Sequence, residues 1–277
     1  VHGIVHLITV PFHYQDVDYY CGPACLEMVF DYYGEDINQF EIADVARTFP
    51  YVTYTDELRR AAHFSNISTS RGAEIPDKNI TGYTLRKLGY AAFEAHYMNL
   101  TQLTSYIDQD KPLILLMWYS AYHVSTHYRV VTGYNETHVF LHDPWNKPLW
   151  GGRYGCAYVA FNYTAFLDLW SYYGNWAFYT SPWTIDVSVP IYIKPESPFQ
   201  INATIVYPQP LPNALDNYLA SSCSATLTLP SNANHTLAQG ETRKKTVGTG
   251  FLQAGADSIV SWMLMANSSI SCNITIE

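Results

Sequence analysis

The sequence predicts an α+β domain over residues 1–183, followed by an all-β domain over residues 184–277. In the first region helical patterns come early and strand patterns later, as in domains that pack helices on an antiparallel sheet. From about Ile185 the pattern changes to short alternating strands that Pro, Gly, Asn and Ser interrupt. A chain of 277 residues is long enough for two domains with cores of ordinary size.

The first predicted helix follows a Gly-Pro turn. Apolar residues recur at helical spacing over Leu26–Tyr33, with Pro23 suited to the first turn and Gly34 to the end. This helix places Cys21 at its N-terminus. Similar patterns predict further helices at Phe40–Thr48, Thr55–His63, Thr81–Leu88 and Leu100–Gln109.

Apolar runs of strand length come next. They predict strands at Pro112–Trp118, Tyr128–Tyr134 and His138–His142. The most apolar of these runs, Pro112–Trp118, is much shorter than the roughly 20 residues that cross a bilayer. No membrane span is therefore expected.

The second domain shows apolar and polar residues in alternation. Strands are expected at Ile201–Tyr207, Ala225–Leu229, Ile259–Leu264 and Cys272–Ile276. The stretch Ile185–Ile193 also alternates, so it is either the first strand or part of a proline-containing connector. Short strands with polar turns of this kind are typical of an immunoglobulin-like β-sandwich.

The charge balance bears on the class of partner. The formal net charge is −9, and charged residues make up only 14% of the chain. The one basic cluster, Arg243–Lys245, is short enough to be a solvated loop. Because nucleic-acid binding draws its affinity from clustered cations, no nucleic-acid partner is expected.

The sequence carries nine Asn-X-Ser/Thr sequons, more than random placement of these residues would give. This excess predicts an N-glycosylated protein that is extracellular or on the cell surface. The sequons lie at Asn66, Asn79, Asn99, Asn135, Asn162, Asn202, Asn234, Asn267 and Asn273.

Five cysteines leave one thiol unpaired if the others form bridges. We expect Cys223 to pair with Cys272 inside the second domain, and Cys25 to pair with Cys156 inside the first. Cys21 is then the free thiol. At a helix N-terminus the helix dipole and backbone N–H groups stabilise a thiolate, although a Cys before a Gly-Pro turn can also be merely buried or bridged.

A hairpin supplies a candidate base for this thiol. With Asn135 near the centre of the turn, His127 and Asp143 face each other directly across the two strands. An imidazole held by a carboxylate keeps its tautomer and can serve as base to a thiol. His123, in the loop before this motif, is the alternative base.

A candidate oxyanion donor precedes the thiol. Gln15 lies six residues before Cys21, and its side-chain amide can donate to a tetrahedral intermediate together with the Cys21 backbone N–H. No cofactor or metal is required for this chemistry.

Four motifs resemble those of the bacteriocin-processing, double-glycine-leader peptidases and their stand-alone relatives in the papain-like clan. The resemblance covers about residues 8–180 and implies a papain-like fold for the first domain. It also implies an oxyanion role for Gln15, with Cys21 as nucleophile, His127 as base and Asp143 as orienting residue. Tyr20 departs from the Asp or Asn that the family often carries. The motifs are Val10–Gln15, Cys21–Ala24, His127–Tyr134 and His142–Trp145.

The sequence thus predicts a secreted or cell-surface cysteine peptidase that hydrolyses peptide bonds in a peptide or protein substrate. The β-sandwich would place it on a cell surface, a partner or a second copy. One alternative is a non-catalytic, glycosylated cell-surface or filament-forming subunit that uses the fold as an architectural module. Another is acyl transfer to an amine instead of water, which needs the same residues.

Overall fold

The computed structural model describes residues 6–48, 52–64, 88–146, 155–216, 218–230, 235–267 and 275–276. The chain forms two compact units. One comprises the residues up to Pro182 together with Leu211–Leu215, and the other comprises Trp183–Pro210 and the residues from Asp216 onward.

The segment Leu211–Leu215 corrects the predicted division, which assigned it to the second domain. It belongs to the first unit because its backbone bonds to an edge strand there. Ala214 forms a β-bridge with Ala95, and the Leu215 N–H donates to the Glu94 carbonyl at 3.1 Å. Because Ala95 and Ala214 are far apart in the chain, the pattern of apolar residues does not indicate this contact.

A seven-stranded antiparallel sheet forms the centre of the first unit. Its strands follow the order β2-β7-β3-β4-β5-β6, and β1 pairs with β4. The strands are β1 (His6–Leu7), β2 (Ala91–Ala95), β3 (Leu113–Trp118), β4 (Thr126–Tyr134), β5 (His138–His142), β6 (Val159–Asn162) and β7 (Ala177–Ser181). The three strands predicted from apolar runs correspond to β3, β4 and β5.

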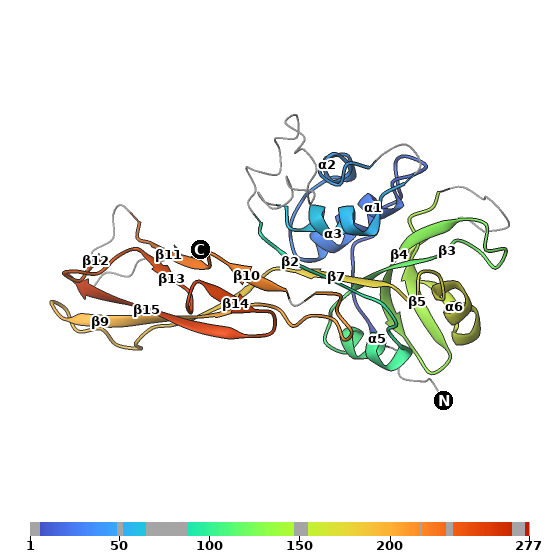
Figure 1. Ribbon diagram of the computed structural model, residues 1–277. Coiled ribbons are helices and arrows are strands. Elements are labelled where there is room, and N and C mark those ends of the chain that lie inside the picture. Colours follow the sequence, from blue (N-terminus) through green and yellow to red (C-terminus); the bar gives the residue numbers. More distant parts are fainter. Residues whose placement is uncertain are drawn as a thin grey trace. The chain divides into compact units, whose positions relative to one another are not determined.

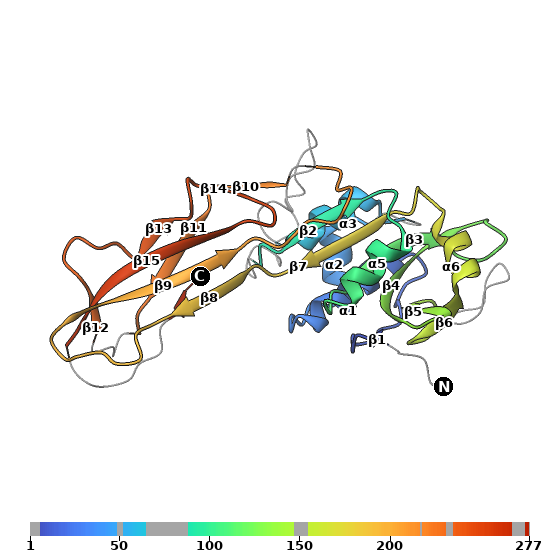
Figure 2. The same cartoon turned by 90° about the horizontal axis from the view of Figure 1, so that it is seen from below.

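Helices cover this sheet: α1, α2 and α3 lie together on one side, and α5 lies on the other (Figures 1 and 2). The helices are α1 (Cys21–Tyr32), α2 (Gln39–Val45), α3 (Thr55–Ala62), α5 (Leu100–Ile107) and α6 (Tyr163–Trp170). Four of them lie where helices were predicted, while α6, β1, β2, β6 and β7 of this unit were not predicted. All of the predicted helix Thr81–Leu88 except its last residue lies outside the described residues.

The first helix begins at Cys21 and is buried through most of its length. Every residue from Gly22 to Phe30 is buried, and the helix packs against β4. Pro23 stands in the first turn, where a missing backbone N–H costs nothing. Since surrounding side chains hold the helix on all sides, the position of Cys21 is fixed.

The hairpin of β4 and β5 has a register different from the one predicted. Val130 faces His142, and a bulge lies between Val131 and Gly133. The turn is closed by a hydrogen bond from the Asn135 N–H to the His138 carbonyl, so its centre lies one to two residues beyond Asn135. His127 and Asp143 are therefore not directly opposed, although their side chains still meet.

The second unit contains only strands among its described regular elements. A four-stranded sheet has the order β12-β15-β9-β8, and β13-β11-β16 and β10-β14 form smaller sheets. The strands are β8 (Thr184–Ser188), β9 (Pro198–Val206), β10 (Leu219–Ser221), β11 (Ser224–Thr228), β12 (His235–Leu237), β13 (Lys244–Thr246), β14 (Phe251–Gln253), β15 (Asp257–Ala266) and β16 (Thr275–Ile276).

Buried and exposed residues alternate along β9 and β15, as the sequence pattern predicted. The side chains of Ile201, Trp262 and Leu264 are completely buried and form part of the core of this unit. Of the predicted strand Cys272–Ile276, the structure describes Thr275–Ile276. The immunoglobulin-like arrangement stays a prediction.

The cysteines differ from the predicted pairing. Cys25 and Cys156 are free cysteines, so the bridge predicted between them is not formed. The physical reason is their placement: Cys25 is completely buried inside α1, whereas Cys156 is exposed. Cys223 is also a free cysteine, so its predicted bridge to Cys272, which lies outside the described residues, is not formed either.

Five sequon asparagines lie in the described part of the chain, and each is exposed or half-buried. Three of these side chains cap or close local structure through their oxygen: Asn99 caps α5, Asn162 caps α6 and Asn135 closes the hairpin turn. Glycosylation attaches to the nitrogen, so these roles leave the acceptor atom available. The other four sequons, Asn66, Asn79, Asn234 and Asn273, lie outside the described residues.

In the parts of the chain that the structure describes, no helix has the length and apolarity needed to cross a membrane.

Candidate active site

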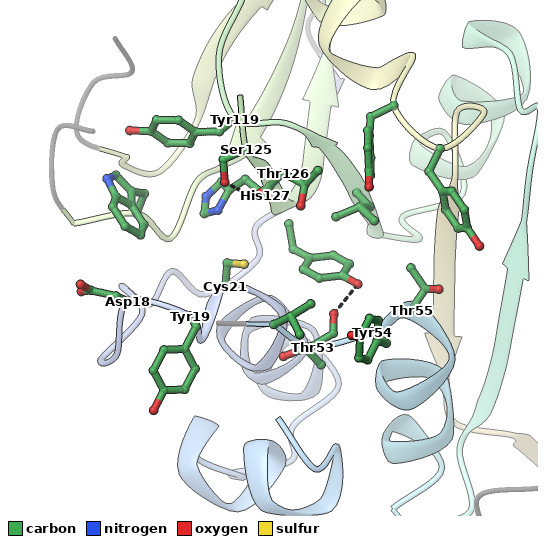
Figure 3. A pocket seen from close by; sticks show the side chains of 16 residues that line it. Asp18, Tyr19, Cys21, Thr53, Tyr54, Thr55, Tyr119, Ser125, Thr126 and His127 are labelled. Carbon is green, nitrogen blue, oxygen red and sulfur yellow. Dashed lines mark hydrogen bonds between the residues drawn. The ribbon is translucent and has the colours of Figure 1, made fainter. Parts of the chain in front are cut away.

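A cavity of about 640 Å³ lies in the first unit, between the start of α1, the segment 52–55 and strands β3 and β4. Cys21 and His127 both line it, and in Figure 3 the Cys21 side chain lies below the His127 ring. Among the described residues, Asp18 is the only Asp or Glu that lines it. Aromatic side chains form much of its wall: Tyr19, Tyr54, Tyr119, Tyr128, Trp145, Tyr172 and Tyr173.

Cys21 is the first residue of α1 and is half-buried. Burial by itself would raise the pKa of its thiol, but a hydrogen bond to His127 and the charge of that ring outweigh burial. Backbone hydrogen bonds at Tyr128 and Gly22 act in the same direction, and the net pKa of Cys21 is lowered. The site therefore favours a thiolate.

His127 connects this thiol to a carboxylate. Its Nε2 donates to Asp143 Oδ1 at 2.7 Å, which leaves Nδ1 for the Cys21 sulfur. The ring is only 3% exposed, and burial by itself would lower its pKa. The Asp143 charge and hydrogen bond outweigh burial and raise the pKa of His127. A thiolate beside a protonated imidazole is the arrangement that this pair of shifts favours.

Arg129 completes the buried charge network, and the sequence analysis gave it no role. Its Nε donates to Asp143 Oδ2 at 2.7 Å, and its two terminal nitrogens donate to the carbonyls of Trp118 and Tyr119. Burial acts to raise the pKa of Asp143, but the charges of Arg129 and His127 hold it well below its usual range. Asp143 thus stays ionised.

A signal for Arg129 was present in the sequence. A charged side chain in a strand that is otherwise apolar is rarely buried unless it is paired. Arg129 and His127 stand two positions apart on β4 and therefore share one face of the strand. That spacing could have indicated a common carboxylate partner.

The backbone around Asp143 leaves no room for a side chain on Gly155. A Cβ at Gly155 would overlap the Asp143 carbonyl oxygen and would lie 2.7 Å from Oδ1. The Trp145 N–H donates to the same Oδ1 at 3.0 Å, and the Asp143 N–H donates to the Cys156 carbonyl at 3.1 Å. The carboxylate is thus fixed by its own backbone as well as by its charged partners.

Gln15, the predicted oxyanion donor, is 1% exposed and is not one of the residues that line the cavity. Its side-chain Nε2 donates to the Val17 carbonyl at 2.8 Å, and within the described residues its Oε1 has no hydrogen-bond partner. Its backbone N–H donates to the Pro144 carbonyl at 2.9 Å, directly after Asp143. The oxyanion role stays a prediction.

The structure does not bring the other candidates to the thiol. His123, the alternative base, lies beside Asp168, with 3.1 Å between Nε2 and Oδ2, and stacks on Trp118. Cys25 lines no part of the cavity, and burial raises the pKa of its thiol well above the ordinary value. In the described ranges, no three His, Cys, Asp or Glu residues are grouped to hold a metal ion.

Comparisons with known proteins bear on this site. The model of the Peptidase_C39 like family matches residues 7–178. The peptidase domain of Streptococcus ComA, a bi-functional ABC transporter in a quorum sensing pathway, is 19% identical, with a TM-score of 0.42 over 61% of this chain and 96% of that chain. No curated protein matches the chain.

Two further solved structures are similar at comparable levels. A double glycine motif protease from an AMS/PCAT transporter, in complex with its leader peptide, is 15% identical, with a TM-score of 0.42 over 64% of this chain and 94% of that chain. A putative C39-like peptidase from Bacillus anthracis is 17% identical, with a TM-score of 0.41 over 64% of this chain and 96% of that chain. Because the family model matches well over half of its residues, the chain belongs to the Peptidase_C39 like family, and this membership indicates a cysteine peptidase.

Proposed function

We propose that the chain hydrolyses peptide bonds through a Cys21–His127–Asp143 triad. The observation that carries the proposal is the continuous hydrogen-bonded path from the thiol to the buried carboxylate, at the wall of a cavity. A structural role would not require a lowered pKa at Cys21 or an ionised Asp143 beneath the imidazole. The family match supports the same chemistry.

In this mechanism the Cys21 thiolate attacks the carbonyl carbon of the scissile bond. The tetrahedral intermediate collapses as His127 Nδ1 gives its proton to the departing amine, which leaves an acyl group on the sulfur. His127 then takes a proton from water, and the hydroxide attacks the acyl carbon. The carbon–sulfur bond breaks, which releases the acid and restores the Cys21 thiolate. Asp143 stays ionised and keeps Nε2 protonated throughout.

We propose that Gln15 donates to the oxyanion, together with the Cys21 backbone N–H at the start of α1. The first N–H groups of a helix have no acceptor within the helix, so this donor points outward. The Gln15 Nε2 carries two N–H groups, and its bond to the Val17 carbonyl uses one of them, which leaves the other for an oxyanion.

An extracellular or cell-surface location is also a proposal. It is supported by the excess of sequons and by the exposed or half-buried position of the five that the structure describes. Glycosidase treatment of protein from its native source should lower its mass and convert occupied Asn residues to Asp. An unchanged mass would contradict the secretory route.

The proposed activity is tested first by alkylation. Native protein is treated with limiting iodoacetamide at about pH 6 and mapped by mass spectrometry of its peptides. We expect rapid, selective modification of Cys21, lost in Cys21→Ala and retained in the matched control Cys25→Ala. A Cys21 that is free but unreactive would favour the non-catalytic, architectural subunit instead.

A further inference from the structure

The loop that carries Gln15 is held from one side by a single buried side chain, that of Gln39 at the start of α2. Gln39 is 3% exposed. Its Oε1 accepts from the Asp16 N–H at 2.7 Å, and its Nε2 donates to the Tyr14 carbonyl at 3.0 Å. These two backbone groups belong to the residues immediately before and after Gln15.

The remaining N–H of the Gln39 amide is also used. Nε2 donates to Glu27 Oε2, at 2.9 Å, in the middle of the buried helix α1. All the polar atoms of the amide are thus engaged, and together they connect the Gln15 loop to the helix that begins with Cys21. The other side of Gln15 is held by Pro144 and by Asn146, whose Nδ2 donates to the Gln15 carbonyl at 3.1 Å.

We propose that Gln39 is a positioning residue that sets where the Gln15 amide stands relative to the Cys21 thiol. This inference rests on the proposed function, because it assigns Gln15 to the oxyanion. The bonds fix the backbone on both sides of Gln15, so the amide can be presented without rearrangement during the reaction. A displacement of about 1 Å at such a group can cost on the order of 10²-fold in rate.

Only an amide can make this set of bonds. A Glu at position 39 has the same shape, but its ionised carboxylate has no donor for the Tyr14 carbonyl and would repel Glu27. Gln39→Glu therefore removes two of the three bonds and keeps the one from the Asp16 N–H, without changing volume. Gln109→Glu, a Gln on an exposed turn after α5, makes the same chemical change away from the site and is the matched control.

The test compares two reagents for Cys21. p-Nitrophenyl acetate acylates the thiolate through a tetrahedral oxyanion, whereas iodoacetamide alkylates it by displacement at carbon without one. We expect Gln39→Glu to slow acylation about 10- to 100-fold and to leave alkylation within about twofold. Gln109→Glu should change neither rate. In a Gln15→Ala background, Gln39→Glu should cause no further loss of acylation, since the two residues act as one unit.

Equal slowing of both reactions by Gln39→Glu would overturn the inference, because that pattern indicates damage to the whole site. The same loss with and without Gln15 would also overturn it. If Gln39→Glu does not fold, as judged by its thermal unfolding, Gln39→Met keeps the length of the side chain and serves in the same comparison. Wild-type protein that reacts with neither reagent would overturn the proposed function and this inference with it.

Discussion

Cys21 and Cys25 stand one turn apart in the same helix, yet their environments act on their thiols in opposite directions. Burial acts to raise the pKa of both. At Cys21 the hydrogen bond and charge of His127 reverse that effect, whereas at Cys25 the nearby Cys21 and Asp143 charges add to it and Arg129 offsets only part. The comparison shows that contact with His127, and not burial, separates the two thiols: the pKa of Cys21 is lowered by that contact, whereas Cys25 has none to offset its burial.

The largest expected effect comes from replacing each of the two cysteines by alanine in separate variants. Cys21→Ala should lower peptidase activity by at least about 10³-fold, because the nucleophile is lost. Cys25→Ala should keep activity within about threefold, with a small loss of stability for a buried sulfur. The measurement is initial-rate hydrolysis of a casein digest under matched protein concentration. Comparable losses in the two variants would refute the assignment of roles.

Arg129→Met tests how much the buried ion pair between Arg129 and Asp143 stabilises the first unit. Removing Arg129 leaves His127 as the charged partner of the buried Asp143, and removing one partner of a buried ion pair typically costs about 3–5 kcal/mol. The thermal midpoint of the first unit should fall accordingly, as followed by calorimetry. Arg129→Lys keeps the charge but loses the planar fork that reaches Trp118 and Tyr119, so it should be intermediate. A thermal midpoint unchanged in Arg129→Met would contradict this account.

His127→Ala should make the thiol of Cys21 resemble that of Cys25, with a raised pKa and slower alkylation. Without the imidazolium, burial of the Cys21 thiol is opposed only by the backbone hydrogen bonds at Tyr128 and Gly22, so the pKa of the thiol should rise. Alkylation by iodoacetamide at pH 6 should then slow by about 10- to 100-fold and recover as the pH is raised, because the thiolate fraction increases. His123→Ala is the control and should keep the wild-type pH profile. A similar slowing in His123→Ala would reinstate that residue as the base.

The smallest expected effect concerns how tightly the residues around Asp143 are packed. Gly155→Ala places a Cβ against the Asp143 carbonyl oxygen, so the backbone must shift, at a cost of about 1–3 kcal/mol. In Gly22→Ala, beside Cys21, the new Cβ would meet Thr53 Cβ at 3.2 Å and Tyr128 Cδ2 at 3.3 Å. These are side-chain contacts that can relax, so Gly22→Ala should cost less. Urea unfolding of both variants provides the measurement, and the reverse order would refute this view of the packing.

Several parts of the fold could be predicted from the sequence because they depend on local pattern. The helix that begins at Cys21 followed from apolar spacing and a proline in its first turn, and β5 was predicted with its observed bounds, His138–His142. The alternation in β9 and β15 likewise follows from one buried face. Most of the unpredicted strands were missed because short segments such as β2 and β6 carry too few residues to show a period.

The candidate site was predictable in its residue types and chain order, but not in its geometry. The predicted pairing of His127 with Asp143 named the right two residues through the wrong register, since the bulge after Val131 shifts the hairpin. Their contact comes from side-chain reach around the end of β5, not from direct opposition. Arg129 went unassigned because its place on the same face of β4 as His127 was not used to pair it with Asp143.

By itself, the sequence determined the first helix with Cys21 at its start, the candidate residues in their order along the chain, and the change from mixed to all-strand pattern near Ile185. Only the tertiary structure decided which thiol is activated, which cation holds Asp143 ionised, and that Gln39 connects the Gln15 loop to α1. The physical reason is that apolar periodicity acts over a few neighbouring residues. A pKa or a hydrogen-bond network, in contrast, depends on distances between groups that folding brings together from far apart in the chain.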